Sequence, residues 1–437
     1  MSQLPRYESY KDSGVQWLGE IPSHWDVKRM KFVVTNVGDK IDAKESDLRY
    51  FGLENIESFT GKLLDSVELE SEGVGHRFQK DDVLFGKLRP YLAKVFLAQE
   101  EGLSSTEALV FRSSEVIYPK FLSYYCLSQD FINEVNGTTF GSKMPRASWD
   151  DISSFRMVYP SLDEQKIIAD FLDKRLAQVD ALIAKQEILL EKLAEQRVAL
   201  ISHAVTKGLN PDVEMKESTN IWLGKIPETW VLKPTKYFLS YVGSGKTPKG
   251  GSEVYIDEGI MMIRSQNVHD DGLRLEDVVH ITDEADQGQI NTRVYEDDVL
   301  LNITGASLGR VSLVPKGIPL ANVNQHVCIL RPIQNLILPE FLHLIMQSHY
   351  AKSLIKSEEN GTSREGLTFE QIKAMVFALP LIDEQMKICE YIKVELGFIN
   401  NSRDACNNLI GKLKEYRSTL ITQVVTGKID VRNIKVN

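Results

Sequence analysis

The sequence has few cysteines and no long apolar run, and these absences exclude several classes of protein. The four cysteines show no CxxC spacing and have no histidine pair at zinc-site spacing: Cys126, Cys328, Cys389 and Cys406. We therefore expect no structural zinc and a reducing compartment. The N-terminus has no apolar signal core, and the longest apolar run, 375–382, is too short to cross a bilayer. Together these features predict a soluble, cytoplasmic protein.

Catalytic motifs are also missing. There is no Asp-Pro-Pro-Tyr or Asn-Pro-Pro-Tyr for amino-methyl transfer, no Phe-x-Gly-x-Gly, no Gly-x-Ser-x-Gly and no His-Glu-x-x-His. Residues 243–247, Gly-Ser-Gly-Lys-Thr, end like a phosphate-binding P-loop, but Ser240 replaces the first glycine and Pro248 follows. We expect a turn whose Lys246, Thr247 and Lys249 could face a nucleic-acid phosphate. The sequence predicts a non-enzymatic chain with no bound metal or cofactor.

Acidic residues outnumber basic ones. The 437 residues carry 51 Lys and Arg against 61 Asp and Glu, a formal charge of −10, and their number suggests two to four domains. Residues 1–160 have a net charge of −5 (19 basic, 24 acidic) and residues 208–380 of −6 (16 basic, 22 acidic). This balance argues against a protein that coats nucleic acid but allows recognition through local basic patches.

The chain contains a unit of about 210 residues written twice. Trp17-Leu-Gly-Glu-Ile-Pro with Trp25 returns as Trp222-Leu-Gly-Lys-Ile-Pro with Trp230. The Asp-Val-Leu at 82–84 returns at 298–300, and the Asp-Glu-Gln at 163–165 returns at 383–385. Because these pairs occur in the same order, we infer a tandem duplication.

Each unit has two parts of different character. Residues 1–160 and 209–380 mix short β-type runs, turns and short helical stretches, which predicts two similar α+β lobes. Residues 161–208 and 381–437 have helical patterns, so they would form two long helices. Packing around a pseudo-twofold axis would make these helices an antiparallel coiled coil that separates the lobes.

The helical pattern is an apolar stripe with alternating steps of four and three residues. It predicts one helix from Asp163 to about Thr206 and an equivalent helix 220 residues later, interrupted by Gly397 and Gly411, which we expect to weaken or bend it. The seam residues are Leu172, Leu176, Val179, Ile183, Leu190, Leu193, Ile392, Leu396, Ile399, Ile410 and Leu413. Pro160 and Pro380 should end the preceding strands. The repeated Asp-Glu-Gln is interpreted as an N-cap, with Asp163 or Asp383 as the acceptor or Ser161 with Glu164 as a capping box.

Polar and basic residues lie in the predicted turns of both lobes. Arg and Lys can bond guanine, Asn and Gln adenine, and Ser or Thr either a base or a phosphate. In the first lobe the candidates are Lys87, Arg89, Tyr91, Ser105, Thr106, Lys143 and Arg146. In the second lobe they are Lys246, Thr247, Lys249, Thr304, Ser307, Arg310, Asn324, Gln325, His326 and Arg364. Solvation alone also makes loops polar, so a coiled-coil scaffold that does not read DNA is the alternative hypothesis.

In these repeated motifs the chain resembles the specificity subunits of type I restriction-modification systems over essentially its whole length. The matching residues are the doubled Trp-Leu-Gly motif, the run Asp82-Val-Leu-Phe-Gly-Lys-Leu-Arg-Pro, Gly245-Lys-Thr-Pro248 and the doubled Pro-x-x-Asp-Glu-Gln.

The resemblance implies two target recognition domains, each reading half of a bipartite site on double-stranded DNA, with the helices setting the gap. It also implies partners: two modification subunits, which bind S-adenosylmethionine and methylate adenine, and restriction subunits, which use ATP and magnesium to translocate and cut DNA. Such an assembly would defend a prokaryotic cytoplasm against phage.

Overall fold

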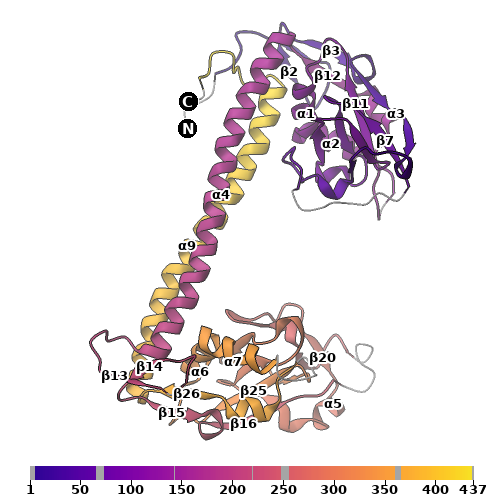
Figure 1. The fold of residues 1–437 in the computed structure, drawn as a ribbon. Coiled ribbons are helices and arrows are strands. Elements are labelled where there is room, and N and C mark those ends of the chain that lie inside the picture. Colours follow the sequence, from indigo (N-terminus) through magenta and orange to yellow (C-terminus); the bar gives the residue numbers. More distant parts are fainter. Residues whose placement is uncertain are drawn as a thin grey trace. The chain divides into compact units, whose positions relative to one another are not determined.

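The computed structural model describes residues 5–64, 73–141, 143–218, 220–247, 255–359 and 366–435. The chain divides into two compact units, Met1–Glu187 with Asn407–Asn437, and Ile188–Cys406. Each unit contains one β-rich lobe and part of two long helices, α4 (Leu162–Lys207) and α9 (Ile382–Val425), which pack antiparallel (Figure 1). The predicted α+β class with two lobes and two antiparallel helices is confirmed. The boundaries proposed at residues 160, 208 and 380 stay a prediction.

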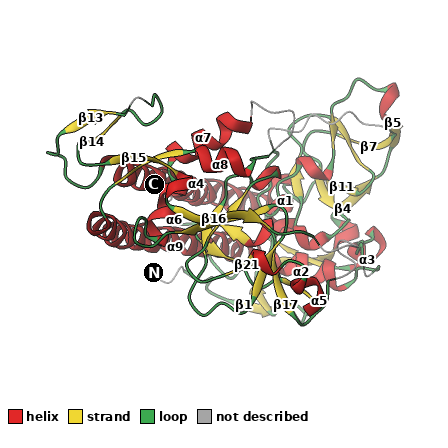
Figure 2. Cartoon of the chain, turned by 90° about the horizontal axis from the view of Figure 1, so that it is seen from below, coloured by secondary structure: helices red, strands yellow, loops and turns green. Residues whose placement is uncertain are grey.

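The first lobe holds two four-stranded sheets. The first sheet has the order β4 (Val34–Val37), β11 (Ala108–Ser113), β8 (Val83–Gly86), β9 (Val95–Leu97), and the second has the order β5 (Lys40–Asp42), β7 (Val74–Phe78), β10 (Gly102–Ser105), β6 (Tyr50–Phe51). Two small pairs are β1 (Tyr10–Asp12) with β2 (Glu20–Pro22) and β3 (Asp26–Arg29) with β12 (Arg156–Tyr159). Its short helices are α1 (Pro119–Leu127), α2 (Gln129–Gly137) and α3 (Trp149–Ser154). Figure 2 distinguishes the strands from the helices by colour.

The second lobe repeats this plan. Its sheets have the orders β16 (Leu239–Ser244), β25 (Val327–Pro332), β22 (Val299–Asn302), β23 (Val311–Leu313) and β20 (Val279–Ile281), β17 (Ile260–Ile263), β24 (Ala321–Val323), β21 (Arg293–Val294). The pairs are β13 (Met215–Glu217) with β14 (Lys225–Pro227), β15 (Val231–Pro234) with β26 (Val376–Leu379), and β18 (Val268–His269) with β19 (Gly272–Leu273). The helices are α5 (Asp283–Gln287), α6 (Pro339–Gln347), α7 (His349–Glu359) and α8 (Phe369–Ala374).

The second sheets of the two lobes share a centre and differ at one edge. In each, a central strand (β10 or β24) has one parallel neighbour (β6 or β17) and one antiparallel neighbour (β7 or β21). The fourth strand is added next to the antiparallel neighbour in the first lobe, as β5, and next to the parallel neighbour in the second, as β20. The two lobes therefore differ at the edge of this second sheet.

The predicted seam accounts for the burial pattern of the long helices. Among the seam residues, Leu172, Leu176, Val179, Ile392, Ile399 and Ile410 are buried, and Ile183, Leu190, Leu193, Leu396 and Leu413 are half-buried. Between residues 181 and 200 every side chain is exposed except at positions 183, 186, 190, 193, 197 and 200, which continue the three-and-four spacing. Helix α9 is continuous through Gly397 and Gly411, so these glycines do not break it. A single apolar stripe per helix is what a two-helix seam requires.

The repeated Asp-Glu-Gln does not cap the long helices in the way we expected. Pro160 and Pro380 do end the preceding strands, but α4 begins at Leu162 and α9 at Ile382, so Asp163 and Asp383 lie inside the first turn. There a carboxylate favours the helix dipole without being the cap. In the alternative, Ser161 does directly precede α4, whereas the Glu164 carboxylate accepts hydrogen bonds from the Tyr7 hydroxyl and the Trp25 indole.

The glutamine of this motif joins each lobe to its helix. The Gln165 side chain accepts from the Tyr118 amide at 2.8 Å and donates to the carbonyls of Val116 and Pro160, both at 2.9 Å. Gln385 makes the same three bonds, with the Leu338 amide and the carbonyls of Leu336 and Pro380. Both glutamines are fully buried, so the repeat preserves a structural contact.

The repeated Asp-Val-Leu holds a buried ion pair. Asp82 is 1% exposed and accepts two hydrogen bonds from the Arg112 guanidinium, at 2.8 and 2.6 Å. Asp298 is equally buried and accepts from Arg331 at 2.7 and 2.8 Å. The hydrogen bond to its aspartate raises the pKa of each arginine. The motif marks a bidentate pair inside the sheet.

The two ends of the chain meet in the first unit. The Asp430 amide donates to the Pro5 carbonyl at 2.9 Å, and the Lys428 ammonium donates to the Leu18 carbonyl at 2.7 Å. The main hydrophobic core of this unit includes Leu420, Val424 and Val431 from the C-terminal part of the chain. The first lobe is therefore completed by residues from both ends of the sequence.

Within the described residues, no helix is long and apolar enough to cross a membrane, and no group of three His, Cys, Asp or Glu side chains is arranged to hold a metal ion. All four cysteines are free thiols.

Candidate nucleic-acid interface

Three segments of the first lobe, which the sequence separates by up to 60 residues, meet at the end of strand β8. The Lys87 amide donates to the Glu107 carbonyl at 2.9 Å, and the Ala147 amide donates to the Lys87 carbonyl at 2.9 Å. The Arg89 amide donates to the Pro145 carbonyl at 2.8 Å. These bonds bring the loop after β8, the turn between β10 and β11 and the segment before α3 into one group, which we call the first loop cluster: residues 86–91, 104–107, 140–141 and 143–147.

The second lobe builds the same frame from different residues. The Ile303 amide donates to the His326 carbonyl at 3.0 Å, and the Leu367 amide donates to the Ile303 carbonyl at 2.9 Å. Thr304 pairs with Gly366 in an isolated bridge, as Leu88 pairs with Arg146 in the first lobe. We call this group the second loop cluster: residues 302–310, 322–326 and 366–367, together with 244–247.

Side chains fix the two clusters in different ways. In the first, the Arg146 Nε lies 3.0 Å from the Glu107 carboxylate, and this ion pair joins two of the three segments. In the second, the Thr304 hydroxyl lies 2.5 Å from the His326 Nδ1, and the Thr247 hydroxyl donates to the Gln325 side chain. An ion pair in one lobe thus corresponds to a chain of hydrogen bonds through His326 in the other.

The predicted residues differ in how far they are free to reach a ligand. Exposed side chains are those of Arg89, Tyr91, Lys143, Lys246, Arg310 and Gln325. Half-buried side chains are those of Lys87, Ser105, Thr106, Arg146, Thr247, Thr304, Ser307 and His326. Lys249 and Arg364 lie outside the described residues. The exposed arginines, lysines and glutamine have the donors that base edges and phosphates accept.

Three further candidates have structural partners. Asn324 is only 6% exposed and accepts from the His326 amide at 3.1 Å, so it shapes its turn and is not available to a base. The Ser105 hydroxyl accepts from the Glu107 amide at 3.2 Å in the equivalent turn of the first lobe. The Ser307 hydroxyl accepts from the buried Asn302 side chain at 3.1 Å.

Sequence reasoning missed two residues that position the clusters. Glu107 holds Arg146, and the Gln289 side chain accepts from the Lys246 amide at 3.0 Å. An acidic residue is not an expected phosphate neighbour, and Gln289 lies more than 40 residues from its partner. Neither had a local signal in the sequence.

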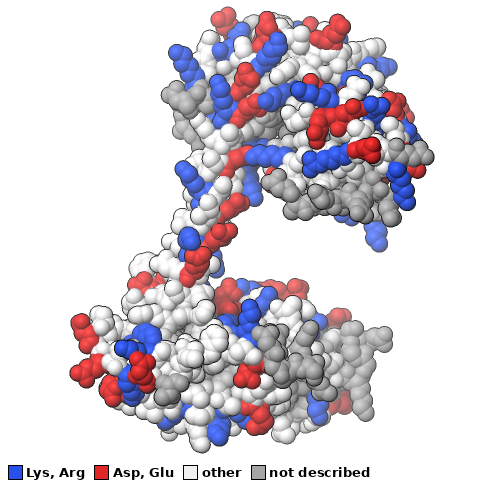
Figure 3. Space-filling view, viewed as in Figure 1, with Lys and Arg blue, Asp and Glu red and all other residues white. Residues whose placement is uncertain are grey.

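The visible surface has no field of one sign. Figure 3 shows Lys and Arg interspersed with Asp and Glu on the side of each unit that it presents. This agrees with the net charge of −10. Local donors in the loop clusters, and no broad basic face in this view, are what the chain offers to a nucleic acid.

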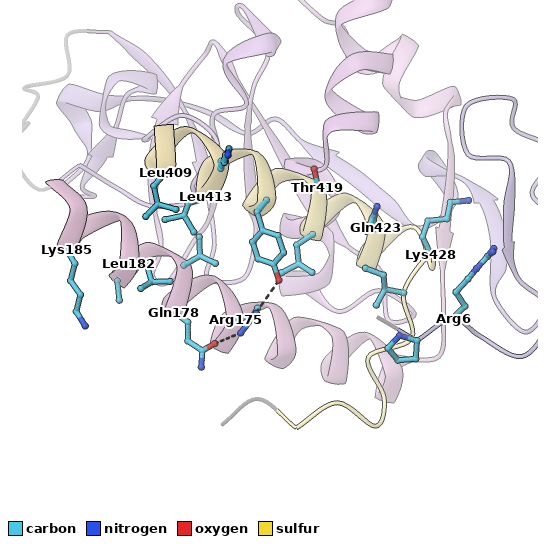
Figure 4. Close-up of a pocket in the computed structure, with 17 residues that line it drawn as sticks. Arg6, Arg175, Gln178, Leu182, Lys185, Leu409, Leu413, Thr419, Gln423 and Lys428 are labelled. Atoms are coloured by element: carbon cyan, nitrogen blue, oxygen red, sulfur yellow. Dashed lines mark hydrogen bonds between the residues drawn. The ribbon is translucent and has the colours of Figure 1, made fainter. Parts of the chain in front are cut away.

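A groove runs between α4 and α9 in the first unit, with a volume of about 1700 Å³ (Figure 4). Its apolar lining includes Val179, Leu182, Leu409, Leu413 and Leu420. Basic side chains also line it, among them Arg6, Arg175, Lys185, Lys412 and Lys428. The Arg175 Nε lies 3.3 Å from the Tyr416 hydroxyl across the two helices.

The model of a protein family described as the type I restriction modification DNA specificity domain matches residues 69–192 and 227–400, together more than half of the chain. The chain is 24% identical over 363 residues to the type I restriction enzyme EcoBI specificity subunit of Escherichia coli, covering 81% of this chain and 75% of that one. It is 22% identical to a putative type I restriction enzyme MjaX specificity subunit of Methanocaldococcus jannaschii, covering 98% and 99%.

Solved structures share the fold. A chain from a structure on complex assembly and conformational transition of the type I R-M system gives a TM-score of 0.71 at 17% identity, covering 93% of this chain and 98% of that one. The HsdS subunit from Thermoanaerobacter tengcongensis gives 0.50 at 17% identity, covering 94% and 98%. The chain belongs to the type I restriction modification DNA specificity family, as the non-catalytic DNA specificity subunit of such a system.

Proposed function

We propose that each loop cluster reads one half of a bipartite DNA site, and that α4 and α9 set the number of unread base pairs between the halves. The observation that carries this proposal is the duplicated backbone frame of the two clusters, which holds different side chains in each lobe. A shared frame with different donors is suited to reading two different sequences.

Rigid attachment of each lobe to the long helices supports a role for them as a spacer. The Arg417 guanidinium, from α9, donates to the Thr60 carbonyl at 2.8 Å and lies 3.2 Å from Asp180 of α4. The equivalent Arg197 donates to the Gln347 side chain at 3.2 Å. A change in helix length would therefore be transmitted to the lobes.

A second pair of contacts repeats this attachment at the short helices. The Thr422 hydroxyl accepts from the Gln129 amide at the start of α2, at 2.9 Å, and the Ser202 hydroxyl accepts from the His349 amide at the start of α7, at 2.8 Å. Each bond satisfies a helix-terminal amide that has no partner within its own helix.

The exposed apolar residues of the long helices support docking of modification subunits there. In the second unit, Ile188, Leu189, Val198, Val394 and Phe398 are between 43% and 64% exposed although they lie on helices whose seam is already filled. The groove of the first unit adds an apolar lining with basic neighbours. Two modification subunits, carrying S-adenosylmethionine, would cover these surfaces and contribute much of the phosphate attraction. Restriction subunits with ATP and magnesium would complete the assembly, acting in a prokaryotic cytoplasm.

Exchange of one lobe tests the division of reading. Residues 209–380 are replaced by those of a family member with another target, and the chain is expressed with its modification subunits. Genome methylation mapping should show a change in one half-site only. A change in both halves, or in neither, would contradict the proposal.

Shortening the helices tests the spacer. Removing Gln186–Lys192 from α4 and Arg403–Leu409 from α9 deletes seven residues from each, one full repeat of the stripe, and keeps the seam in phase. The loss of about 10 Å corresponds to about three base pairs. The methylated motif should keep both half-sites with a shorter gap, and Glu191→Ala with Asn407→Ala is the control of unchanged length. An unchanged gap in the shortened variant would refute the spacer role.

A further inference from the structure

The turn between β24 and β25 presents one exposed amide whose two ends are both held. The Gln325 side-chain oxygen accepts from the Thr247 hydroxyl, and its nitrogen lies 2.9 Å from the His326 Nε2. The other ring nitrogen of His326 lies 2.5 Å from the Thr304 hydroxyl. Three segments of the second loop cluster thus converge on a single glutamine.

The backbone beneath Gln325 is fixed as well. The Asn324 amide donates to the Ile263 carbonyl at 3.1 Å, and the Asn324 side chain accepts from the His326 amide. On the other side, a Cβ on Gly245 would lie 1.6 Å from the Val323 carbonyl oxygen, so only glycine allows this close approach. The approach brings Thr247 to the glutamine.

The Gln325 amide keeps part of its hydrogen-bonding capacity free for a ligand. A glutamine amide has two acceptor lone pairs and two N–H donors. With one end bonded to Thr247 and the other to His326, one acceptor and one donor are left. If the amide were turned by 180°, its nitrogen would face Thr247 and its oxygen His326, and again one acceptor and one donor would be left. Either orientation of the amide leaves the same two groups free.

We propose that Gln325 reads an adenine in the major groove of the half-site recognised by the second lobe. The free acceptor takes the adenine N6 hydrogen and the free donor binds N7, the bidentate pattern that adenine presents. This inference rests on the proposed function and adds the base and the residue that reads it.

The hydrogen bonds that Gln325 already makes to Thr247 and His326 also explain why it would reject the other bases. Guanine presents two acceptors, O6 and N7, whereas the glutamine has only one free donor. Cytosine offers a donor without a neighbouring acceptor, and thymine offers an acceptor beside a methyl group. Because the side chain is already held before DNA arrives, little conformational freedom is lost on binding.

The equivalent position of the first lobe holds Thr106, and the next residue, Glu107, pairs with Arg146. The turn is the same, since both clusters bond the amide of the last turn residue to the side chain two positions earlier. The inference therefore applies to the second half-site alone.

The first experiment replaces the reader. The full chain carrying Gln325→Ala is assembled with the modification subunits of its own system and genome methylation is mapped. One A·T position in one half-site should become tolerant of other bases, by about 5-fold to 140-fold in relative methylation. Gln334→Ala, an exposed glutamine elsewhere in the second lobe, is the matched control and should keep the motif. An unchanged motif for Gln325→Ala, relaxation at a G·C position, or a uniform loss over all sequences would overturn the proposal.

The second experiment changes the base. In duplexes whose read adenine has carbon in place of N7, binding by the wild-type complex should weaken by about 5-fold or more, while binding by Gln325→Ala should not respond. Equal weakening of both proteins would contradict the contact. The weakening expected for the wild-type complex is measured without any variant, and no weakening there would by itself contradict the contact.

The third experiment tests the positioning role of Thr247. Thr247→Val keeps the shape and removes the hydroxyl, so discrimination at the same A·T position should fall, and Thr247→Ser should restore it. Loss without rescue by serine would argue for packing alone. If lobe exchange leaves both half-sites unchanged, the proposed function has failed; if exchange succeeds and the motif of Gln325→Ala is unchanged, only this inference has failed.

Discussion

Arg89 in the first lobe and Gly305 in the second occupy the same place in the repeat, because each directly follows a residue that forms an isolated β-bridge. Both have a left-handed backbone, with φ of 51° and 71°. Glycine adopts this conformation without a steric cost, whereas a residue with a Cβ pays about 1 kcal/mol or more. An exposed arginine held in this conformation is therefore a candidate for a functional role of its side chain. The comparison teaches that the frame of the clusters is shared and that the lobes differ in what they place on it.

The largest expected effect concerns the Asp82–Arg112 ion pair of the first lobe and the Asp298–Arg331 ion pair of the second. Asp298→Ala and Asp82→Ala should each lower the free energy of unfolding by about 3 kcal/mol, because a partly buried arginine loses its partner. The second-lobe variant should be the worse, since the Arg331 side chain is 27% exposed against 39% for Arg112 and also packs on the Tyr295 ring at 4.4 Å.

Denaturant titration of both variants, with the exposed Glu276→Ala as control, gives the comparison. An equal loss, or a larger one for Asp82→Ala, would show that arginine burial does not rank the two pairs.

The next largest effect is a difference between the two lobes in their stability in acid. Burial lowers the pKa of His343 in α6 to about 4 from its ordinary 6.5, and the equivalent residue of α1 is Ser123, which does not titrate. The unfolded chain binds more protons between these two values, so stability is full above pH 6.5 and falls as the pH drops towards 4. The partial exposure of the ring limits the loss to about 2 kcal/mol.

Unfolding measured from pH 7 to pH 4 should therefore show a shallower slope in His343→Gln than in the wild type. The exposed His203→Gln should leave the slope unchanged. Equal slopes in all three proteins would mean that the His343 ring is hydrated in the folded state.

The third test uses the two residues with a left-handed backbone, Arg89 and Gly305. Arg89→Gly should raise the free energy of unfolding by about 0.5 to 1 kcal/mol by relieving backbone strain, while methylation of cognate sites falls; Gly305→Ala should lower stability by about 1 kcal/mol. Arg29→Gly, at φ −65°, is the control and should not stabilise. A stabilised Arg89→Gly with full activity would remove the argument that the arginine reads DNA.

The smallest effect contrasts the long helices, since α4 contains no glycine and α9 contains two. An added Cβ would meet no atom within 4 Å at Gly397 or Gly411. Each change to alanine should raise the free energy of unfolding by about 0.5 kcal/mol. Thermal unfolding of the single and double variants measures this, and a decrease would reveal a contact that only glycine permits.

Much of this architecture could be predicted because it leaves periodic or repeated signals. The seam from Leu172 to Leu413 follows from a three-and-four spacing, and the terminating prolines follow from their missing amide. The roles of Gln165 and Thr422 could not be predicted, since their partners are 47 and 293 residues away. The N-cap prediction failed because both Asp and Ser are good caps and only the backbone decides between them. Strands of two to six residues gave no signal for two sheets per lobe.

The meeting of the chain's two ends has a consequence for biosynthesis. The second unit is one continuous stretch, Ile188–Cys406, and all of it is synthesised before Leu420, Val424 and Val431, which the core of the first unit needs, emerge from the ribosome. Translation of the stretch between takes about 10 to 40 seconds at usual rates. During that interval the first lobe exposes an unfilled core. The lobe synthesised first is therefore the one finished last, and it is the one that would need a chaperone most.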